Sequence, residues 1–149
     1  MSGILPTKPV KATRINPKIL LLYGVPKVGK TSTLAKLDNC LTLDTEKGAD
    51  MYDMLRLTVS SVTGKTILNP DGSVFSTSIN DFIAGMEAEA KRQLEAKEQL
   101  RFPYKYIAVD TLDRLEDYCE ISATALYKAT TIGKNFDGKS VLDLPNGAG

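Results

Sequence analysis

The chain alternates between short, almost wholly apolar runs and longer segments in which apolar residues recur every three or four positions. Short apolar runs are typical of buried strands, and the three-to-four spacing is typical of amphipathic helices. Strands are predicted at residues 19–23, 40–44, 54–59 and 104–110, and helices at 30–37 and 112–130. Strands that alternate with helices predict an α/β fold with a mainly parallel sheet sandwiched between helices.

A turn signal interrupts this alternation in the middle of the chain. Asn69-Pro70-Asp71-Gly72 separates two short strand-like segments at 65–68 and 73–76. Proline and glycine at these turn positions favour a tight reversal, so a β-hairpin is predicted as a surface excursion at about 60–77.

A long helix is predicted after the hairpin. Thr77 or Ser78 can cap its start, and Phe102-Pro103 should end it. One apolar stripe, predicted to pack into the core, is formed by Ile79, Phe82, Ile83, Met86, Ala90 and Leu94.

Composition narrows the chemistry. The 149 residues suit one domain, and the net charge of +1 gives no overall case for nucleic acid or membranes. There is no histidine, which excludes imidazole bases and His-based metal sites. Cys40 and Cys119 are isolated and predicted to be buried thiols. With no long apolar run and no signal peptide, we expect a cytoplasmic protein with a basic, extended lead-in at 1–18, followed by one domain at 19–149.

The most specific motif follows the first predicted strand. Gly24-Val25-Pro26-Lys27-Val28-Gly29-Lys30-Thr31 fits G-x-x-x-x-G-K-[ST], the phosphate-binding loop, with a strand before it and a helix after it. Lys30 would reach the β- and γ-phosphates of a nucleotide, and the Thr31 hydroxyl would bind Mg²⁺. The predicted nucleotide-binding residues are Gly24, Val25, Pro26, Lys27, Val28, Gly29, Lys30, Thr31 and Ser32.

Two acidic positions at strand ends complete the candidate site. Asp110 ends an apolar strand downstream of the loop and is a candidate Mg²⁺ ligand, with Thr111 able to assist. Glu46 follows the strand at 40–44 and is a candidate for orienting the attacking water. The residues around Glu46 alone leave a second interpretation open, a cluster of acidic residues that caps a helix.

With these residues in view, the chain resembles the RecA-like P-loop ATPases. It is most similar to the phage-encoded, minimal members associated with single-strand annealing and recombination. Three segments carry the resemblance across roughly residues 19–130: Tyr23–Thr31, Leu43–Asp50 and Ile107–Leu112. It implies ATP rather than GTP, a catalytic role for Glu46, single-stranded DNA as partner and a homo-oligomer. Independently, Asp110-Thr111-Leu112-Asp113 lacks the glycine of the Asp-x-x-Gly motif of GTPases.

The resemblance also implies a strand between the phosphate-loop strand and the Asp110 strand. In this chain only residues 140–142 could form that strand, and this segment is short for a strand. We therefore expect a RecA-like core that is incomplete at its C-terminus, in the front part of a longer protein. Two other functions stay open. One is a small-molecule or nucleotide kinase. Such a kinase would need a lid with several arginines, and the five arginines of this chain are scattered along the sequence. The other is a non-hydrolysing, nucleotide-gated DNA-binding or assembly protein.

Overall fold

The structure is a computed structural model that describes residues 19–144, so the predicted basic lead-in at 1–18 lies outside the described residues. The chain divides into two compact units after Lys30. The described part of the first unit is residues 19–30, and that of the second is residues 31–144.

In the first unit, the strand predicted at 19–23 is wrong. These residues form no regular structure, and their side chains are exposed, Ile19 by 88% and Tyr23 by 97%. A strand is stable only when a neighbour accepts and donates its main-chain hydrogen bonds. No strand between residues 19 and 144 pairs with this segment, so its apolar character alone does not make it a strand.

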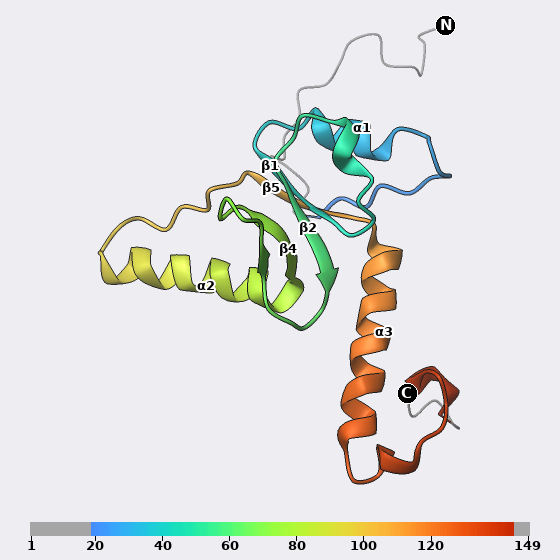
Figure 1. Cartoon of the computed structure of the whole chain (residues 1–149). Helices are drawn as coiled ribbons and strands as arrows, with labels where there is room; N and C mark the ends of the chain where they lie inside the picture. Colours follow the sequence, from blue (N-terminus) through green and yellow to red (C-terminus); the bar gives the residue numbers. More distant parts are fainter. Residues whose placement is uncertain (1–18, 145–149) are drawn as a thin grey trace, which may run out of the picture. The chain divides into compact units, whose positions relative to one another are not determined.

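The second unit is built on a five-stranded sheet with the order β3-β4-β2-β1-β5 (Figure 1). Its strands are β1 (Cys40–Asp44), β2 (Arg56–Ser61), β3 (Ile67–Leu68), β4 (Val74–Ser78) and β5 (Tyr106–Asp110). All neighbouring strands are parallel except β3 and β4, which form the predicted hairpin. Because β4 pairs with β2, the hairpin extends the sheet. The α/β prediction with a mainly parallel sheet is confirmed.

The strand register sorts the side chains of β1 onto two faces. Leu41 and Leu43 lie on the face that carries the core, together with Val59 of β2. Ile79 and Phe82 of α2 (Ile79–Glu95) pack against this cluster, so two members of the predicted stripe reach the core. The other face carries Cys40, Thr42 and Asp44, all buried. It also carries Asp110, the partner of Asp44 in the register, and Thr31 of α1 (Lys30–Ala35) contacts Asp110 on that face. Helices therefore lie on both faces of the sheet.

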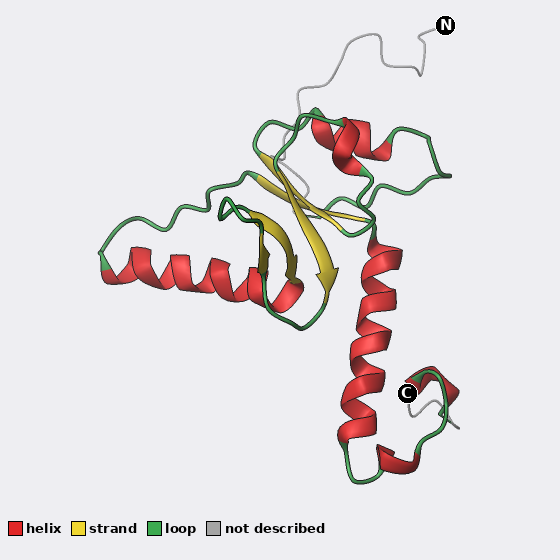
Figure 2. Cartoon of the chain, viewed as in Figure 1, coloured by secondary structure: helices red, strands yellow, loops and turns green. Residues whose placement is uncertain are grey.

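Helix α2 begins where the sequence predicts but ends earlier. The Ser78 hydroxyl accepts a hydrogen bond from the Asp81 amide, as an N-cap does. Lys97 has a positive φ of 57°, and its amide donates to the Leu94 carbonyl, which closes the helix well before Phe102. The segment between α2 and β5 is drawn as loop in Figure 2. The buried Gln93 side chain holds it by hydrogen bonds in both directions with the main chain of Arg101.

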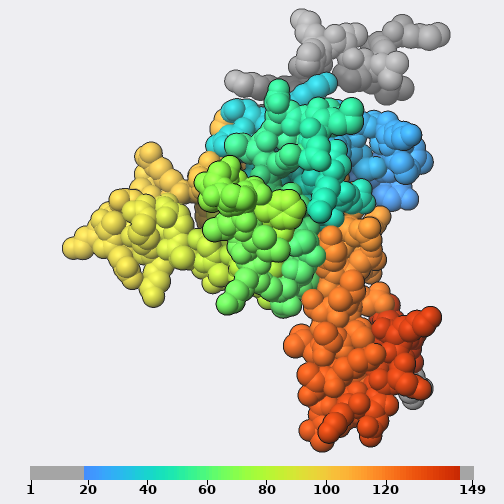
Figure 3. Space-filling model, viewed as in Figure 1, coloured from blue at the N-terminus to red at the C-terminus, as the bar shows by residue number. Residues whose placement is uncertain are grey.

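Helix α3 (Leu112–Ala129) starts directly after β5 and carries the last described segment against its C-terminal half (Figure 3). The Val141 amide donates to Thr124 Oγ1, and the rings of Tyr127 and Phe136 meet edge to face. Residues 141–143 form a 3₁₀ helix, so they do not supply the additional strand. The remaining 3₁₀ helices are Ala49–Met51 and Gly133–Asn135.

Two further outcomes concern the cysteines and membranes. Cys40 is buried as predicted, but Cys119 is exposed, because α3 packs through the side that carries Thr124 and Tyr127. Both thiols are free. Within residues 19–144, none of the helices has the length and apolar character needed to cross a bilayer.

Candidate functional site

In the first unit, the predicted phosphate loop curls back on its own start. The Lys30 ammonium donates hydrogen bonds to the carbonyl oxygens of Gly24, at 2.8 Å, and Val25, at 3.2 Å. A side chain on Gly24 would meet Val28 Cγ1 at 2.9 Å from its Cβ, and Gly29 has a positive φ of 93°. The two glycines therefore occur where the loop needs close approach and left-handed backbone.

The remaining predicted binding residues surround this turn. Val25 and Val28 are strongly exposed, Pro26 is exposed, and Lys27 adopts a positive φ of 67°. Ser32 follows Thr31 in the first turn of α1.

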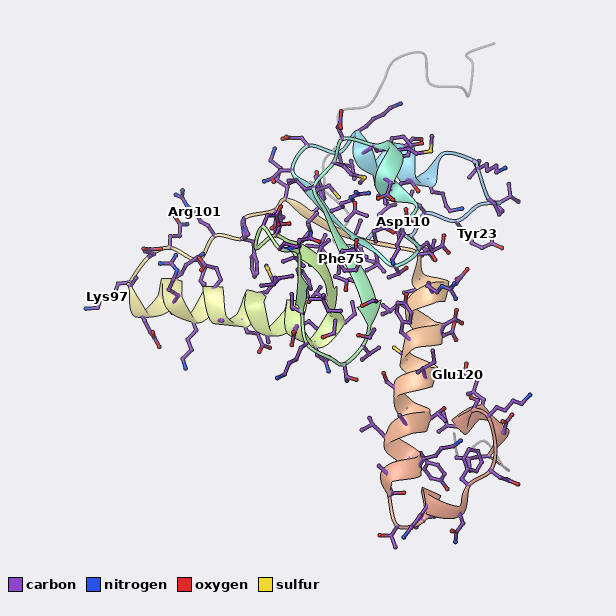
Figure 4. The ribbon with its side chains drawn as sticks, viewed as in Figure 1. Tyr23, Phe75, Lys97, Arg101, Asp110 and Glu120 are labelled. Atoms are coloured by element: carbon purple, nitrogen blue, oxygen red, sulfur yellow. The ribbon has the colours of Figure 1, made fainter. Side chains whose placement is uncertain are left out.

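In the second unit, the two predicted metal ligands lie side by side. Thr31 Oγ1 donates a hydrogen bond of 2.7 Å to Asp110 Oδ2, across 79 residues of sequence. Figure 4 shows Asp110 at the point where β5 meets α3. A hydroxyl and a carboxylate oxygen are the ligand types that Mg²⁺ prefers. Among residues 19–144, no three His, Cys, Asp or Glu side chains are grouped so that they could hold a metal ion.

The acidic residues in the segment after β1 make different contacts. Asp44, 2% exposed, accepts hydrogen bonds from the amides of Glu46, Gly48 and Ala49 and so caps the 3₁₀ turn that follows. These capping contacts are made by Asp44, and Glu46 takes part in them only through its amide. The Glu46 carboxylate is exposed and accepts a 2.9 Å hydrogen bond from Thr111 Oγ1. Thr111, its partner, follows Asp110 directly in the sequence.

Sequence reasoning gave no role to Thr45 and Tyr118. The Thr45 hydroxyl accepts from the Thr111 amide at 2.8 Å, and its own amide donates to the Asp110 carbonyl at 2.9 Å. The Tyr118 hydroxyl donates to the Thr45 carbonyl at 3.1 Å. The peptide bond between Asp110 and Thr111 is cis. In the sequence, the one sign of a role for Thr45 is that it lies between two acidic residues at a strand end. That position does not reveal hydrogen-bond partners more than 60 residues away.

A cleft of about 330 Å³ lies at the opposite end of β1. Its lining is mostly apolar and includes Leu37, Cys40 and Leu55, with Asp53 as its charged member. Ligands of open parallel sheets bind at the carboxyl ends of the strands. Asp110 is the last residue of β5, and Glu46 comes shortly after the end of β1, so both lie at that edge. The cleft is therefore separate from the candidate site.

Comparison with known proteins identifies the family. Residues 16–141, well over half of the chain, match the AAA domain family. The chain belongs to this family, whose members are nucleotide-binding proteins of the P-loop ATPase class. The five-stranded, mostly parallel sheet with helices on both faces agrees with a P-loop fold. No curated protein matches the chain, and no solved structure matches it.

Proposed function

We propose that this chain binds Mg²⁺-ATP and hydrolyses its γ-phosphate bond, and that turnover is coupled to single-stranded DNA in recombination or annealing. The observation that carries the ATPase proposal is the pairing of Thr31 with Asp110 beside the Thr111–Glu46 hydrogen bond. A hydroxyl and a carboxylate suited to Mg²⁺ are bonded to each other, and Thr111, the residue after Asp110, is bonded to a second, exposed carboxylate suited to a water molecule.

Each residue has a separate task in this proposal. Lys30 and the loop amides would neutralise phosphate charge, and Thr31 and Asp110 would hold Mg²⁺. Glu46 would orient a water molecule and accept its proton as the oxygen attacks the γ-phosphorus, so that ADP and inorganic phosphate are the products. Bound Mg²⁺ would supply charge neutralisation on the phosphate oxygens. The chain's own contribution is positioning and electrostatic stabilisation.

The DNA part of the proposal rests on the resemblance to RecA-like ATPases, and the same resemblance leads us to propose a homo-oligomer. Their support is the order of three segments: the phosphate loop, the Glu46 segment and the Asp110 strand. We expect turnover to be slow until DNA or a neighbouring subunit completes the site.

The test is phosphate release from Mg²⁺-ATP with and without single-stranded DNA. Lys30→Ala and Glu46→Gln should each lower turnover by about 100-fold or more, while Glu46→Gln keeps nucleotide binding. Lys36→Ala and Glu87→Gln are matched controls at exposed positions and should retain turnover.

Three outcomes would contradict parts of the proposal. The same rate of ATP hydrolysis with and without single-stranded DNA would contradict the proposed coupling to DNA. Phosphate transfer that requires an added acceptor would indicate a kinase. ATP binding with no turnover under any condition would indicate a nucleotide-gated binding protein.

A further inference from the structure

Thr45 occupies a position from which one side chain holds both strand ends of the candidate site. The residue follows β1 directly and is 3% exposed. Its Oγ1 accepts from the Thr111 amide and lies 3.1 Å from the Asp110 carbonyl oxygen and 3.0 Å from that of Thr111. A hydroxyl has one proton to donate, so it serves one of these carbonyls at a time.

The contacts of Thr45 reach both carboxylates of the site. On one side, its hydroxyl and its amide fix the main chain of Asp110 and Thr111, from which the Asp110 carboxylate and the Thr111 hydroxyl project. On the other side, Thr45 precedes Glu46, whose carboxylate accepts from that same Thr111 hydroxyl. These hydrogen bonds form a closed ring through Thr45, Thr111 and Glu46.

Helix α3 supports this ring from outside. The Tyr118 hydroxyl donates to the Thr45 carbonyl, which leaves the Thr45 main chain bonded through both its N–H and its C=O. A residue held through both main-chain groups and through its side chain has little freedom to shift.

We propose that Thr45 is a positioning residue of this site, which sets the separation of the Asp110 and Glu46 carboxylates through its hydroxyl. This inference rests on the proposed function, because those two carboxylates are its Mg²⁺-binding and water-orienting groups. Removal of partners that orient metal ligands typically lowers metal affinity or activity about 10- to 100-fold.

Strand β1, which directly precedes Thr45, supplies a matched control. Thr42 is fully buried, and its Oγ1 has no nitrogen or oxygen partner among residues 19–144; the thiol of Cys40 is the one weak partner beside it. Thr→Val has the same shape at both positions. At position 42 it removes a hydroxyl that no main-chain amide needs as an acceptor, and at position 45 it leaves the Thr111 amide without its acceptor.

The experiment compares Thr45→Val, Thr45→Ser and Thr42→Val with the wild-type chain. Turnover is measured as a function of Mg²⁺ concentration at saturating ATP, well below the unfolding temperature. Thr45→Val should lower kcat about tenfold or more and raise the Mg²⁺ concentration for half-maximal rate. Thr45→Ser, which keeps the hydroxyl, should restore kcat to within about threefold of wild type, and Thr42→Val should leave both quantities unchanged.

A second readout needs no nucleotide. Amide hydrogen exchange at Thr111, followed by NMR on the free chain, should accelerate about tenfold or more in Thr45→Val and stay slow in Thr45→Ser and Thr42→Val. Unchanged exchange at Thr111, or a Thr45→Val chain with a lower melting temperature but wild-type kcat and Mg²⁺ dependence, would overturn the inference. A wild-type chain that neither binds nor hydrolyses Mg²⁺-ATP would overturn the proposed function instead, and the inference with it.

Discussion

Replacing Asp44 by alanine removes the acceptor for three main-chain amides at once. Asp44 Oδ1 accepts from Glu46 at 3.1 Å and from Gly48 at 3.3 Å, and Oδ2 accepts from Ala49 at 3.2 Å. The carboxylate is almost fully buried, so it organises the loop that carries Glu46 from beneath.

The size of the effect follows from which amides can find water instead. Glu46 and Gly48 are exposed, so water can replace most of their bonds, whereas Ala49 is 1% exposed and its amide would stay unpaired. A hydrogen bond to a charged group contributes about 1.5–3 kcal/mol, and a buried unpaired group costs about 1–3 kcal/mol. Asp44→Ala should therefore lower the free energy of unfolding by about 3–4 kcal/mol. Asp44→Asn keeps the Oδ1 acceptor but turns an NH₂ group towards the Ala49 amide, so a loss of about 2 kcal/mol is expected.

Urea denaturation followed by circular dichroism measures these losses. Asp50→Ala is the control, because Asp50 lies in the same segment, is exposed and forms a surface ion pair with Arg56. A surface pair of this kind contributes below about 1 kcal/mol. If Asp44→Ala unfolds within about 0.5 kcal/mol of the Asp50→Ala control, the capping argument is refuted.

Three further predictions follow from other parts of the second unit. Ser78→Ala removes the cap of α2 and the hydrogen bond that the same hydroxyl donates to the Gly64 carbonyl, and should lower the unfolding free energy by about 2 kcal/mol, with Ser78→Thr nearer to wild type in the same denaturation assay. Cys119 should react with a thiol reagent within the mixing time. Cys40 should react only on unfolding, because burial both shields it and raises the pKa of its thiol; two fast thiols in the native chain would contradict the placement of β1. Thr31→Val should weaken Mg²⁺-dependent ATP binding, measured by titration calorimetry, whereas Thr31→Ser, which keeps the hydroxyl, should preserve it. Equal binding by both variants would exclude Thr31 as a metal ligand.

The parts of the fold that the sequence predicted correctly are those with local signals. The strand at 40–44 is apolar and ends in an acid, and the α2 cap is a serine just before an apolar stripe. Both depend on neighbours within a few residues. The predicted strand at 19–23 failed because strand formation depends on a partner elsewhere in the chain, which hydrophobicity does not specify.

The candidate site divides in the same way. The phosphate loop and Asp110 were recognised as sequence motifs. Because Thr31 and Asp110 were both predicted to bind Mg²⁺, a contact between their side chains was expected, and the structure contains one. The roles of Thr45 and Tyr118 were not visible, because their hydrogen bonds join residues 66 and 73 positions apart. Cys119 was predicted to be buried, but it is exposed. An apolar stripe shows that one face of α3 is apolar, but it does not show which face another segment of the chain covers.

The hairpin formed by β3 and β4 offers an attachment point for a fluorescent reporter. It lies at the far end of the strand order from β5, so a dye on its turn would be separated from Asp110 by the width of the sheet. Pro70 in that turn is exposed and has neither an N–H nor a polar side chain to lose, whereas the neighbouring Asp71 bonds to Ser73. A chain carrying Pro70→Cys together with Cys119→Ser would take one label at a surface tip, where added bulk is tolerated, and would report binding or assembly without changing the candidate site.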